Sequence, residues 1–355
     1  MDKFKIDSHK LMYHLPRVND WLQGRSIYPV YMEISPAGSC NHRCVYCALD
    51  FMEYQPRFLN AGIFKERLSE MARLGVKSIM YAGEGEPFLH QDMAQIIAFT
   101  KKSGIDTAVT TNAVLFDRRA ADKTLPFLSW IKVSVNAGIK GTYAKIHRAK
   151  PGDFERVLDN MAYAAELKRK RGYACALGMQ LVLLPENAHE VSTLAKKAKA
   201  AGMDYLVVKP YSQHPLSKTN RYRNIKYNNY LKLAQDLLKF NDEDFHVIFR
   251  IHTMKKWDTA RRPYKHCYAL SFWAYIDAAG DLWACSIYLT KDKFRLGNIY
   301  RSSFKDIWES RKRKELVCWA SDRLDTRACR VNCRMDEINR YLWELKHPPA
   351  HVNFI

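Results

Sequence analysis

Residues 39–51 read SCNHRCVYCALDF and place three of the nine cysteines, Cys40, Cys44 and Cys47, within one short loop. Zinc sites usually combine separated C-x2-C pairs and close with four ligands. Here the spacing is C-x3-C-x2-C, and the one further ligand type nearby is His42, inside the loop. Three thiolates can hold three irons of a cubane cluster and leave the fourth iron open. An open coordination position is what a catalytic metal centre needs.

Length and composition limit the class of protein. A chain of 355 residues suits one large domain plus a smaller one, and a hydrophobic content of 47% excludes disorder. Residues 1–21 are charged throughout, and no apolar run approaches the length of a membrane span. We therefore expect a cytoplasmic protein with no membrane partner. Thiols stay reduced in that compartment, and the odd cysteine count also disfavours disulfides.

The net charge of +20 suggests an anionic partner, which is a nucleic acid, a phosphorylated metabolite or an acidic peptide. The basic residues are scattered through helical segments such as 196–202 and 301–316. Solvated helix faces therefore account for the charge more simply, because net charge bears on partners and not on fold.

Short β-rich runs alternate with segments of helical apolar spacing such as 61–75 and 154–170, as in stacked βα units around a parallel sheet. This pattern predicts an α/β fold, a partial (β/α)6 barrel of the TIM type. The expected strands are residues 31–38, 78–83, 106–112, 130–136, 176–184 and 204–210.

Polar residues follow the expected strands at the end where barrels of this type carry their chemistry. The cysteine loop follows the first strand, GEGEP (83–87) the second, TTN (110–112) the third, SVN (134–136) the fourth and LPEN (184–187) the fifth. Loops are polar in general, but the same placement five times favours a functional site.

The cysteine loop resembles that of the radical S-adenosylmethionine (SAM) superfamily, whose hallmark is C-x3-C-x2-C with an aromatic residue before the last cysteine. Tyr46 supplies that aromatic residue, and the resemblance covers about residues 30–215. It implies a [4Fe-4S] cluster on Cys40, Cys44 and Cys47, with SAM on the open iron. It also implies a 5′-deoxyadenosyl radical that removes a hydrogen atom from the substrate, and an electron donor such as flavodoxin or ferredoxin.

The family places Gly-Gly-Glu-Pro after the second strand to receive the amino group of SAM. This chain reads Gly83-Glu84-Gly85-Glu86-Pro87 there, so Glu86 and Pro87 match while Glu84 stands where the family usually has its first glycine. The resemblance makes Tyr46, Gly85 and Glu86 expected contacts of SAM. A carboxylate can accept hydrogen bonds from an ammonium group, and glycine permits close approach of the backbone.

The same resemblance implies that Ser134 and Asn136 contact the ribose of SAM and that Arg148 meets its carboxylate. Each of these residue types also occurs at such a place for a purely structural reason. Ser and Asn at the end of a strand often only form a turn, and an Arg at the start of a loop is often only solvated.

A second group of cysteines, Cys267, Cys285, Cys329 and Cys333, follows the expected barrel. The stretch DAAGDLWAC (277–285) reads as a β-hairpin that would bring Cys267 and Cys285 together. This region resembles the SPASM and shorter "twitch" extensions of radical SAM enzymes, which implies an auxiliary [4Fe-4S] cluster on these four thiolates. A zinc site with the same ligands is the alternative.

Cys175 and Cys318 belong to neither group. A free cysteine is usually a small buried hydrophobic residue. The alternative is that one of them returns a hydrogen atom to a substrate radical.

The expected organisation is a partial barrel followed by a small α+β iron–sulfur domain. Its segments are an N-terminal extension (1–29), the radical SAM core (30–215), a linker (216–263), the auxiliary cluster domain (264–340) and a tail (341–355).

Several substrate classes fit these features. A sugar, cyclitol or nucleotide-linked sugar that is dehydrogenated or epimerised is favoured, because a single auxiliary cluster and the C-terminal residues 333–355 resemble enzymes of carbohydrate pathways. The positive charge suits a phosphorylated substrate. Peptide modification is the alternative, and RNA modification is less favoured, although aromatic and basic residues alternate in 219–230. A mere electron carrier fits badly with an open iron.

Overall fold

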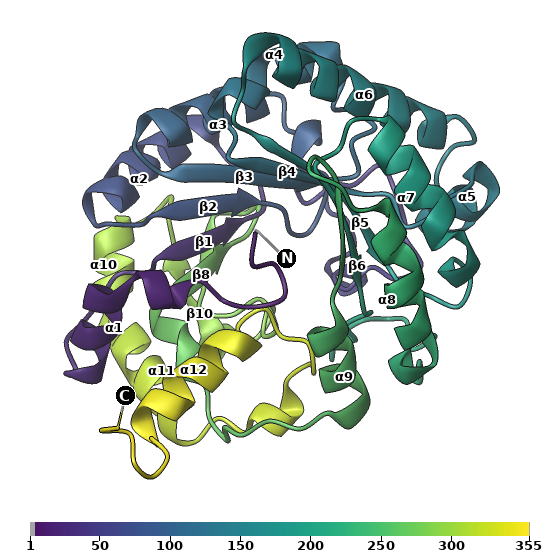
Figure 1. Ribbon diagram of the computed structural model, residues 1–355. Helices are drawn as coiled ribbons and strands as arrows, with labels where there is room; N and C mark the ends of the chain where they lie inside the picture. The colour runs from purple at the N-terminus through teal and green to yellow at the C-terminus, as the bar shows by residue number, and fades with distance from the viewer. Residues whose placement is uncertain (1–3, 355) are drawn as a thin grey trace.

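The computed structural model describes residues 4–354 and contains one ten-stranded sheet that curves around its own axis (Figure 1). The strand order is β10-β9-β8-β1-β2-β3-β4-β5-β6-β7, and all neighbours from β8 to β7 run parallel. The strands are β1 (Tyr31–Ile34), β2 (Ser78–Tyr81), β3 (Asp106–Thr111), β4 (Trp130–Ser134), β5 (Ala176–Val182), β6 (Tyr205–Lys209), β7 (His246–Phe249), β8 (Trp273–Ile276), β9 (Asp281–Trp283) and β10 (Arg295–Asn298).

Helices pack against the outer, convex face of this sheet (Figure 1). Local sequence sets their ends: the side chain of Asn60 caps one helix by accepting a bond from the Ile63 amide, and Gly172 ends the longest helix with φ +65°. The helices are α1 (Leu15–Leu22), α2 (Ala61–Arg73), α3 (Met93–Lys102), α4 (Arg118–Thr124), α5 (Lys140–His147), α6 (Asp153–Arg171), α7 (Val191–Ala200), α8 (Leu231–Leu237), α9 (Ile251–Thr259), α10 (Phe304–Glu309), α11 (Arg311–Asp322) and α12 (Asp336–Lys346).

The expected partial barrel is confirmed, since β1 to β6 occupy the six predicted positions. Each strand ends earlier than its apolar run. Gly83 and Asn136 have φ of +113° and +53°, so the chain leaves the sheet before or at these residues. The polar residues beyond the strands therefore lie in loops at the carboxyl edge.

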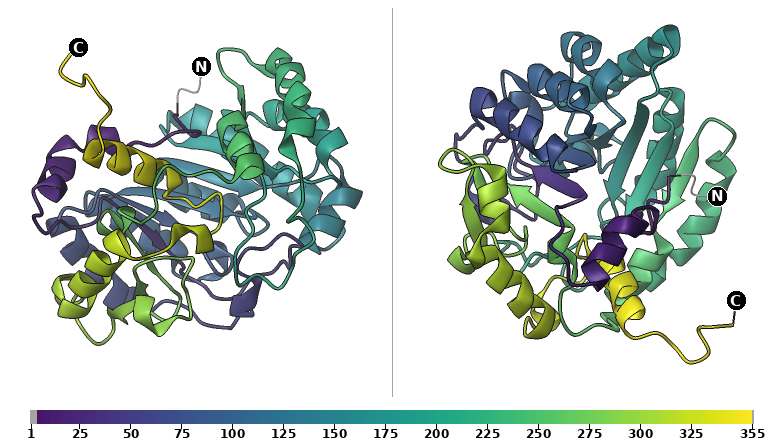
Figure 2. Two further views of the ribbon diagram at one scale, coloured as in Figure 1. Left: turned by 90° about the horizontal axis from the view of Figure 1, so that it is seen from below. Right: turned by 90° about the vertical axis from the view of Figure 1, so that its left-hand side faces the viewer.

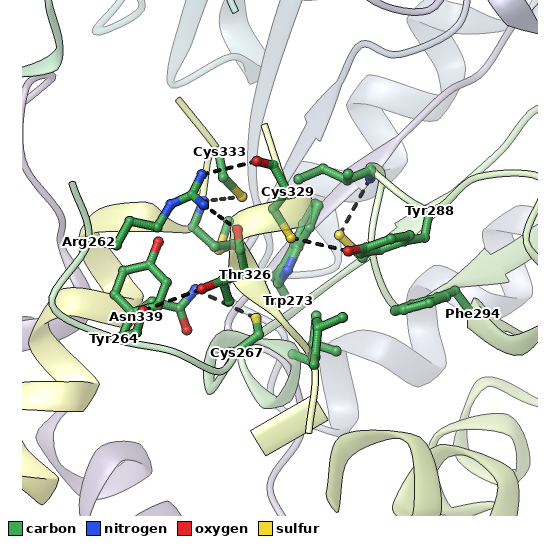
Figure 3. A pocket seen from close by; sticks show the side chains of 15 residues that line it. Arg262, Tyr264, Cys267, Trp273, Tyr288, Phe294, Thr326, Cys329, Cys333 and Asn339 are labelled. Atoms are coloured by element: carbon green, nitrogen blue, oxygen red, sulfur yellow. Dashed lines mark hydrogen bonds between the residues drawn. The ribbon is translucent and has the colours of Figure 1, made fainter. Parts of the chain in front are cut away.

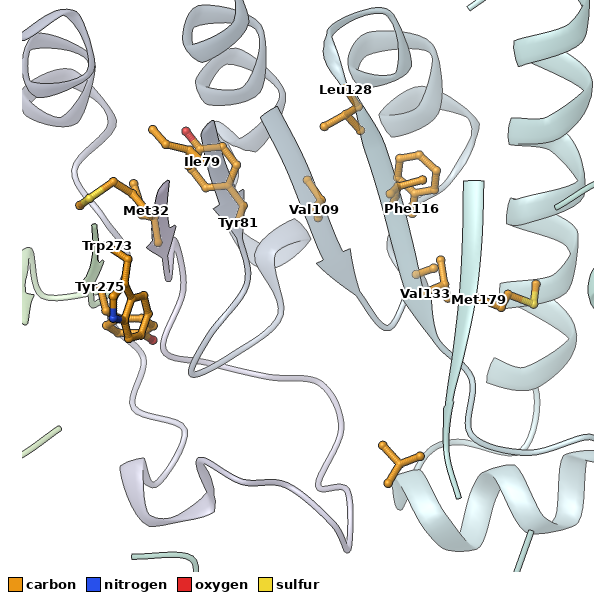
Figure 4. Packing of buried hydrophobic residues seen from close by; sticks show 14 of the residues in the cluster. Met32, Ile79, Tyr81, Val109, Phe116, Leu128, Val133, Met179, Trp273 and Tyr275 are labelled. Carbon is orange, nitrogen blue, oxygen red and sulfur yellow. The ribbon is translucent and has the colours of Figure 1, made fainter. Parts of the chain in front are cut away.

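The outer face of the strands forms the main core with the helices. Met32, Ile79, Val109 and Val133 stand between sheet and helices and are buried (Figure 4). Their sequence neighbours point to the opposite, inner face, because side chains alternate along a strand.

The inner face has an apolar floor. Met80 and Ala108 pack with Tyr31 and Trp130, and Tyr205 and Val207 pack with Ile248, Phe4 and Ile6 of the N-terminal segment. Gly178 is required beneath Tyr205, because a Cβ there would lie 2.2 Å from the tyrosine ring. The N-terminal segment lies inside the curve of the sheet (Figure 1).

The C-terminal region continues the same sheet. β8 pairs with β1 in parallel register, Glu33 opposite Tyr275, and the predicted hairpin is formed by β8 and β9. On the other side β7, which lies in the expected linker, pairs with β6. The expected segment boundaries stay a prediction, and the sheet runs across three of those segments (Figure 2).

The N-terminal segment and α12 connect the two ends of the parallel sheet. The Asp7 carboxylate accepts a bond from Arg250 after β7 (3.1 Å), and the rings of His9 and Tyr341 contact each other in a tilted arrangement, with their centres 4.7 Å apart. Lys256 of α9 forms an ion pair with Asp336 of α12 at 2.7 Å. In the described chain, no helix combines the length and apolarity that crossing a membrane requires.

Candidate functional site

The first cysteine loop lies between β1 and α2 and is held by backbone hydrogen bonds to two other segments. The Glu86 amide donates to the Ser39 carbonyl (2.9 Å), which ties the loop after β2 to the cysteine loop. The amides of Arg43 and Val45 donate to the carbonyls of His147 and Ile146 at the end of α5. The three cysteines are therefore placed at the carboxyl edge of the sheet, where barrel chemistry is expected.

The three thiols are half-buried and influence one another. Burial raises the pKa of Cys40 to about 12, and burial followed by Cys47 and Cys40 raises the pKa of Cys44 well above its usual value. The pKa of Cys47 is raised by burial and opposed by a hydrogen bond from Tyr54. Metal ligation requires thiolates, so a cation here compensates three buried charges at once. The donor set fits an iron cluster with three protein ligands.

A second ligand set shares Cys44. Single ligand atoms of His42, Cys44 and His147 lie within 4.8 Å of one another. His42 bonds Asp153 through Nε2 (3.2 Å), and Nε2 of His147 lies 2.7 Å from the Val135 carbonyl oxygen. A mononuclear metal at this trio would therefore compete with a three-thiolate cluster for Cys44.

Gly85 has no room for a side chain, because a Cβ there would lie 2.0 Å from the Ser39 carbonyl oxygen. The buried Glu86 carboxylate accepts bonds from the Asn112 amide (2.8 Å), the Thr111 hydroxyl (2.5 Å) and the Phe88 amide (3.2 Å). Burial raises its pKa to about 7. The carboxylate thus holds the loops after β2 and β3 together, and its expected contact with SAM stays a prediction.

Glu84, which replaces the family glycine, joins three segments. Its carboxylate accepts bonds from Arg57 Nη2 (2.9 Å) at the end of the cysteine loop and from the Ala278 amide (3.2 Å) in the β8–β9 turn. Burial and then Asp277 raise its pKa to about 7. The residue that departs from the family pattern therefore links the first cysteine loop to the hairpin of the second site.

The other residues expected to contact SAM lie at the same edge in different environments. Asn136 is buried, accepts a bond from the Val182 amide (2.6 Å) and donates to the Tyr46 hydroxyl (2.5 Å). Ser134 accepts a bond from Gln180 (2.7 Å) on the inner face. Arg148 is exposed, with φ +48°, after α5. Contact of Ser134, Asn136 and Arg148 with SAM stays a prediction.

The four remaining cysteines of the expected auxiliary site face one enclosed space. Cys267, Cys285, Cys329 and Cys333 line one small cavity together with Trp273 and other apolar residues (Figure 3). Cys267 precedes β8, Cys285 follows β9, and the last two cysteines flank the turn before α12. The hairpin and this turn thus bring residues more than sixty positions apart into one ligand set.

Each sulfur of this cavity accepts a hydrogen bond, from groups that are not themselves cysteines. Such donors stabilise ligating thiolates and adjust a cluster's potential. The donors are Asn339 Nδ2 to Cys267 (3.5 Å), the Ile287 amide to Cys285 (3.4 Å) and the Met335 amide to Cys333 (3.4 Å). The Tyr288 hydroxyl lies 3.3 Å from Cys329 and is the donor when that sulfur is a thiolate. The four thiols fit a fully ligated cluster.

The two remaining cysteines lie away from the inner face. Cys175 is 1% exposed in the outer core, at the amino end of β5. Cys318 is exposed on α11. Their expected role as hydrogen-atom donors stays a prediction that these positions do not favour.

The loop after β6 lies between the two cysteine sites. The Ser217 hydroxyl donates to the Cys47 carbonyl (3.4 Å), and the Ser212 hydroxyl donates to the Asn332 carbonyl (3.3 Å) beside Cys333. His214 stacks on Phe51 of the first loop at 4.8 Å, and its Nε2 lies 3.2 Å from the Ser286 carbonyl oxygen beside Cys285. The two sites therefore border one region at the mouth of the barrel.

Sequence reasoning missed the cations that face this region. Arg330 and Arg334 directly follow Cys329 and Cys333, while Lys132 and Lys209 lie in otherwise apolar strands. A lysine at an inward position of a buried strand is rare. The stretches IKVS and VVKP could therefore have indicated that Lys132 and Lys209 are functional residues.

Comparison with known families matches two regions. The family described as "Radical SAM superfamily" matches residues 34–198, and the family described as "SPASM: Iron-sulfur cluster-binding domain" matches residues 267–334. These domains imply a [4Fe-4S] cluster with SAM and an auxiliary iron–sulfur cluster. The second match names iron–sulfur, rather than zinc, as the ligand class of the four-cysteine cavity.

Among curated proteins, a GTP 3′,8-cyclase of Limosilactobacillus fermentum is 31% identical over 147 residues, which is 40% of this chain and 43% of the relative. The chain thus spans less than half of that relative's length. Two solved structures share the fold. They are Streptococcus suis SuiB bound to precursor peptide SuiA (15% identical, TM-score 0.65, 86% of this chain and 71% of that one) and anSMEcpe with AdoMet and the Cp18Cys peptide (20%, 0.59, 90% and 95%).

Proposed function

Because this chain contains a radical SAM domain and a C-terminal SPASM domain, we propose that it is a radical SAM enzyme that dehydrogenates a carbinol carbon of a sugar, cyclitol or nucleotide-linked sugar. A cluster held by Cys40, Cys44 and Cys47, with SAM on its open iron, would supply a 5′-deoxyadenosyl radical when reduced. In the proposed reaction the substrate loses one hydrogen atom to that radical, then one proton to solvent and one electron, and its C–OH becomes C=O. The auxiliary site takes the electron.

The proposal depends on the way the auxiliary loop enters the barrel. Arg334, next to Cys333, pairs with Glu33 (2.9 Å) and donates to the Tyr31 hydroxyl (3.1 Å), and both partners lie on β1. The four-cysteine cavity is thereby placed at the mouth of the barrel, beside the loop after β6 that also contacts Cys47. A substrate radical formed in this region would lie close to the auxiliary site, which would accept its electron.

The positions of the cysteines favour oxidation over epimerisation. An epimerase needs a donor that returns a hydrogen atom to the substrate carbon. Seven of the nine cysteines line the two cysteine sites, and Cys175 and Cys318 lie in the outer core and on the surface. Loss of an electron to the auxiliary site is the outcome that this arrangement supports.

The inner face favours a small substrate. Phe4 and Ile6 pack on the floor beside Tyr205, and the ion pair of Lys256 with Asp336 joins α9 to α12. A relative over the radical SAM region is named for GTP, a phosphorylated small molecule. The peptide-bound neighbours share the fold at 15–20% identity, so a peptide substrate is the outcome against which the proposal is tested.

The test uses the anaerobically reconstituted full chain with SAM, a strong reductant and a host extract that is filtered into low-mass and high-mass fractions. We expect the low-mass fraction to stimulate release of 5′-deoxyadenosine, counted by mass spectrometry. Stimulation by the high-mass fraction alone would overturn the small-molecule proposal.

Repeating the reaction in D2O separates the two chemistries. A dehydrogenated product has lost two hydrogen atoms, and its oxidised carbon carries no deuterium. An epimerised product keeps its composition and carries one deuterium at the inverted carbon, which would overturn the oxidation.

A further inference from the structure

Two lysines project from the inner face above the apolar floor. Lys132 of β4 alternates with the outer-core residues Ile131 and Val133, and Lys209 of β6 follows Val208, which is also in the outer core. Both lysines therefore point into the barrel. Lys132 Nζ lies 4.9 Å from the centre of the Trp130 ring on the floor. The lysines thus mark a polar layer between the floor and the loops that carry the cysteines.

Two arginines of the auxiliary loop reach the same layer. Arg334 meets Glu33 and Tyr31 of β1, as described above. Arg330 has a buried Nε with no hydrogen-bond partner among residues 4–354. A buried guanidinium N–H without an acceptor is costly, so an absent acceptor is expected beside it.

The pKa of Lys209 responds to several cations in its neighbourhood. Burial, then Lys132, Arg250, Arg334 and Arg330 lower the pKa of Lys209 to about 7. Within the described chain, Glu33 pairs with Arg334 and Asp7 with Arg250, while no carboxylate pairs with Lys209 or Arg330. Positive charge therefore exceeds negative charge at this point.

We propose that Lys209 and Arg330, with Arg334 and Lys132 beside them, bind the phosphate or diphosphate group of the substrate. The site rests on the proposed function and names the substrate class. Arginine offers several N–H donors in a plane that matches phosphate oxygens, and lysine adds a point charge. Ordinary surface cations are solvated, whereas these meet inside a barrel and leave one donor unpaired.

The position of the anion orients the rest of the substrate. Arg330 lies beside the auxiliary cavity, and the loop after β6 connects that cavity to Cys47. A phosphate held by Arg330 and Lys209 leaves the attached carbon skeleton to extend toward the first cysteine loop. The carbon that loses hydrogen then lies between the two cysteine sites.

A carboxylate is a second source of the same chemistry, because SAM itself carries one. One carboxylate supplies a single negative charge. The four cations, Lys132, Lys209, Arg330 and Arg334, favour the larger negative charge of a phosphate ester or diphosphate. The experiment separates these two sources by measuring a phosphate probe and SAM independently.

The probe is radiolabelled inorganic pyrophosphate, measured by equilibrium dialysis against the reconstituted full chain at low salt. We expect saturable binding, and a loss of affinity of at least tenfold in Arg330→Gln and in Lys209→Gln, because each substitution removes a charged hydrogen-bond donor to the anion. Arg330→Lys should retain part of the affinity. Arg169→Gln, on the exposed end of α6, is the matched control and should bind as the parent protein does.

Iron content and thermal unfolding show whether each variant is intact. Should Arg330→Gln lose auxiliary iron, Lys209→Gln decides, since Lys209 lies on a strand and ligates nothing. Absence of saturable pyrophosphate binding, or unchanged binding in an intact Lys209→Gln, overturns the site. Weaker SAM binding in the variants without pyrophosphate binding in the parent assigns the cations to SAM and also overturns it. No turnover is measured, so failure of the proposed oxidation is a separate result.

Discussion

The two cysteine sites of this protein differ in ligand number and in enclosure. The first places three half-buried thiols, Cys40, Cys44 and Cys47, on one loop at the edge of the sheet. The second gathers four thiols from a hairpin and a distant turn into one cavity, and each sulfur accepts a hydrogen bond. Three ligands leave an iron for SAM, whereas four ligands leave a cluster that only carries electrons. From this difference we propose that the first site cleaves SAM and that the second transfers electrons.

Removal of the first site should have the largest effect. The triple variant Cys40→Ala, Cys44→Ala, Cys47→Ala should form no detectable 5′-deoxyadenosine, because SAM loses its iron. Iron should fall from about eight to about four atoms per chain. Measurement of iron and nucleoside on the same sample checks both, and retained SAM cleavage would contradict the assignment.

Removal of one auxiliary ligand should uncouple the reaction instead. Cys285→Ala opens the second site, so we expect product to fall at least a hundredfold while SAM cleavage continues at a measurable rate. The ratio of oxidised product to 5′-deoxyadenosine, followed by mass spectrometry, reports this change. A ratio equal to that of the parent protein would exclude the auxiliary site as electron acceptor.

Gly85→Ala tests the close approach between the loop after β2 and the cysteine loop. The new Cβ would meet the Ser39 carbonyl oxygen at 2.0 Å, so the loops must separate and SAM cleavage should fall at least tenfold. Gly141→Ala in α5 is the control, because a Cβ there meets nothing within 4 Å. That substitution should stabilise the protein by about 0.5–1 kcal/mol. Equal activity of the two variants would show that the contact is unimportant.

Glu84, which links the two sites, should make the free energy of unfolding depend on pH. Burial and Asp277 raise its pKa to about 7, so the folded protein binds an extra proton from about pH 4.5 to 7. The stabilisation that Glu84 contributes is complete below about pH 4.5 and is lost as the pH rises from about 4.5 to 7. Glu84→Gln should flatten the pH dependence of the unfolding free energy by about 1–3 kcal/mol across the window.

Urea unfolding at several pH values measures this slope. Glu166→Gln, at an exposed position of α6, serves as the control and should leave the slope unchanged. A slope that is the same in Glu84→Gln and in the parent protein would remove Glu84 as its source.

The two cysteines outside both sites should have the smallest effects. Cys318→Ser lies on an exposed helix position and should leave turnover and stability unchanged. Cys175→Ala removes a buried sulfur and should lower stability by about 1 kcal/mol without affecting turnover. A variant that forms 5′-deoxyadenosine but stalls before product would restore that cysteine as a hydrogen-atom donor.

The sequence was sufficient for the barrel and for the grouping of cysteines, because apolar periodicity and local spacing determine both. The parallel pairing of β8 with β1 joins residues more than two hundred positions apart, which no local pattern records. The packing of Phe4 and Ile6 on the inner face of the sheet could not be predicted for the same reason. The sequence identifies Arg330 and Lys209 as positively charged residues. Their proximity depends on the position of the loop that carries Cys333, which the sequence does not predict.

The division between an open and a closed site is tested most directly by the electron paramagnetic resonance spectra of two reduced variants with and without SAM. One lacks Cys40, Cys44 and Cys47, and the other lacks the four auxiliary cysteines. Addition of SAM should change the spectrum of the variant that keeps the first site and leave the other spectrum unaltered. A change in the variant that keeps only the four-cysteine site would contradict the assignment.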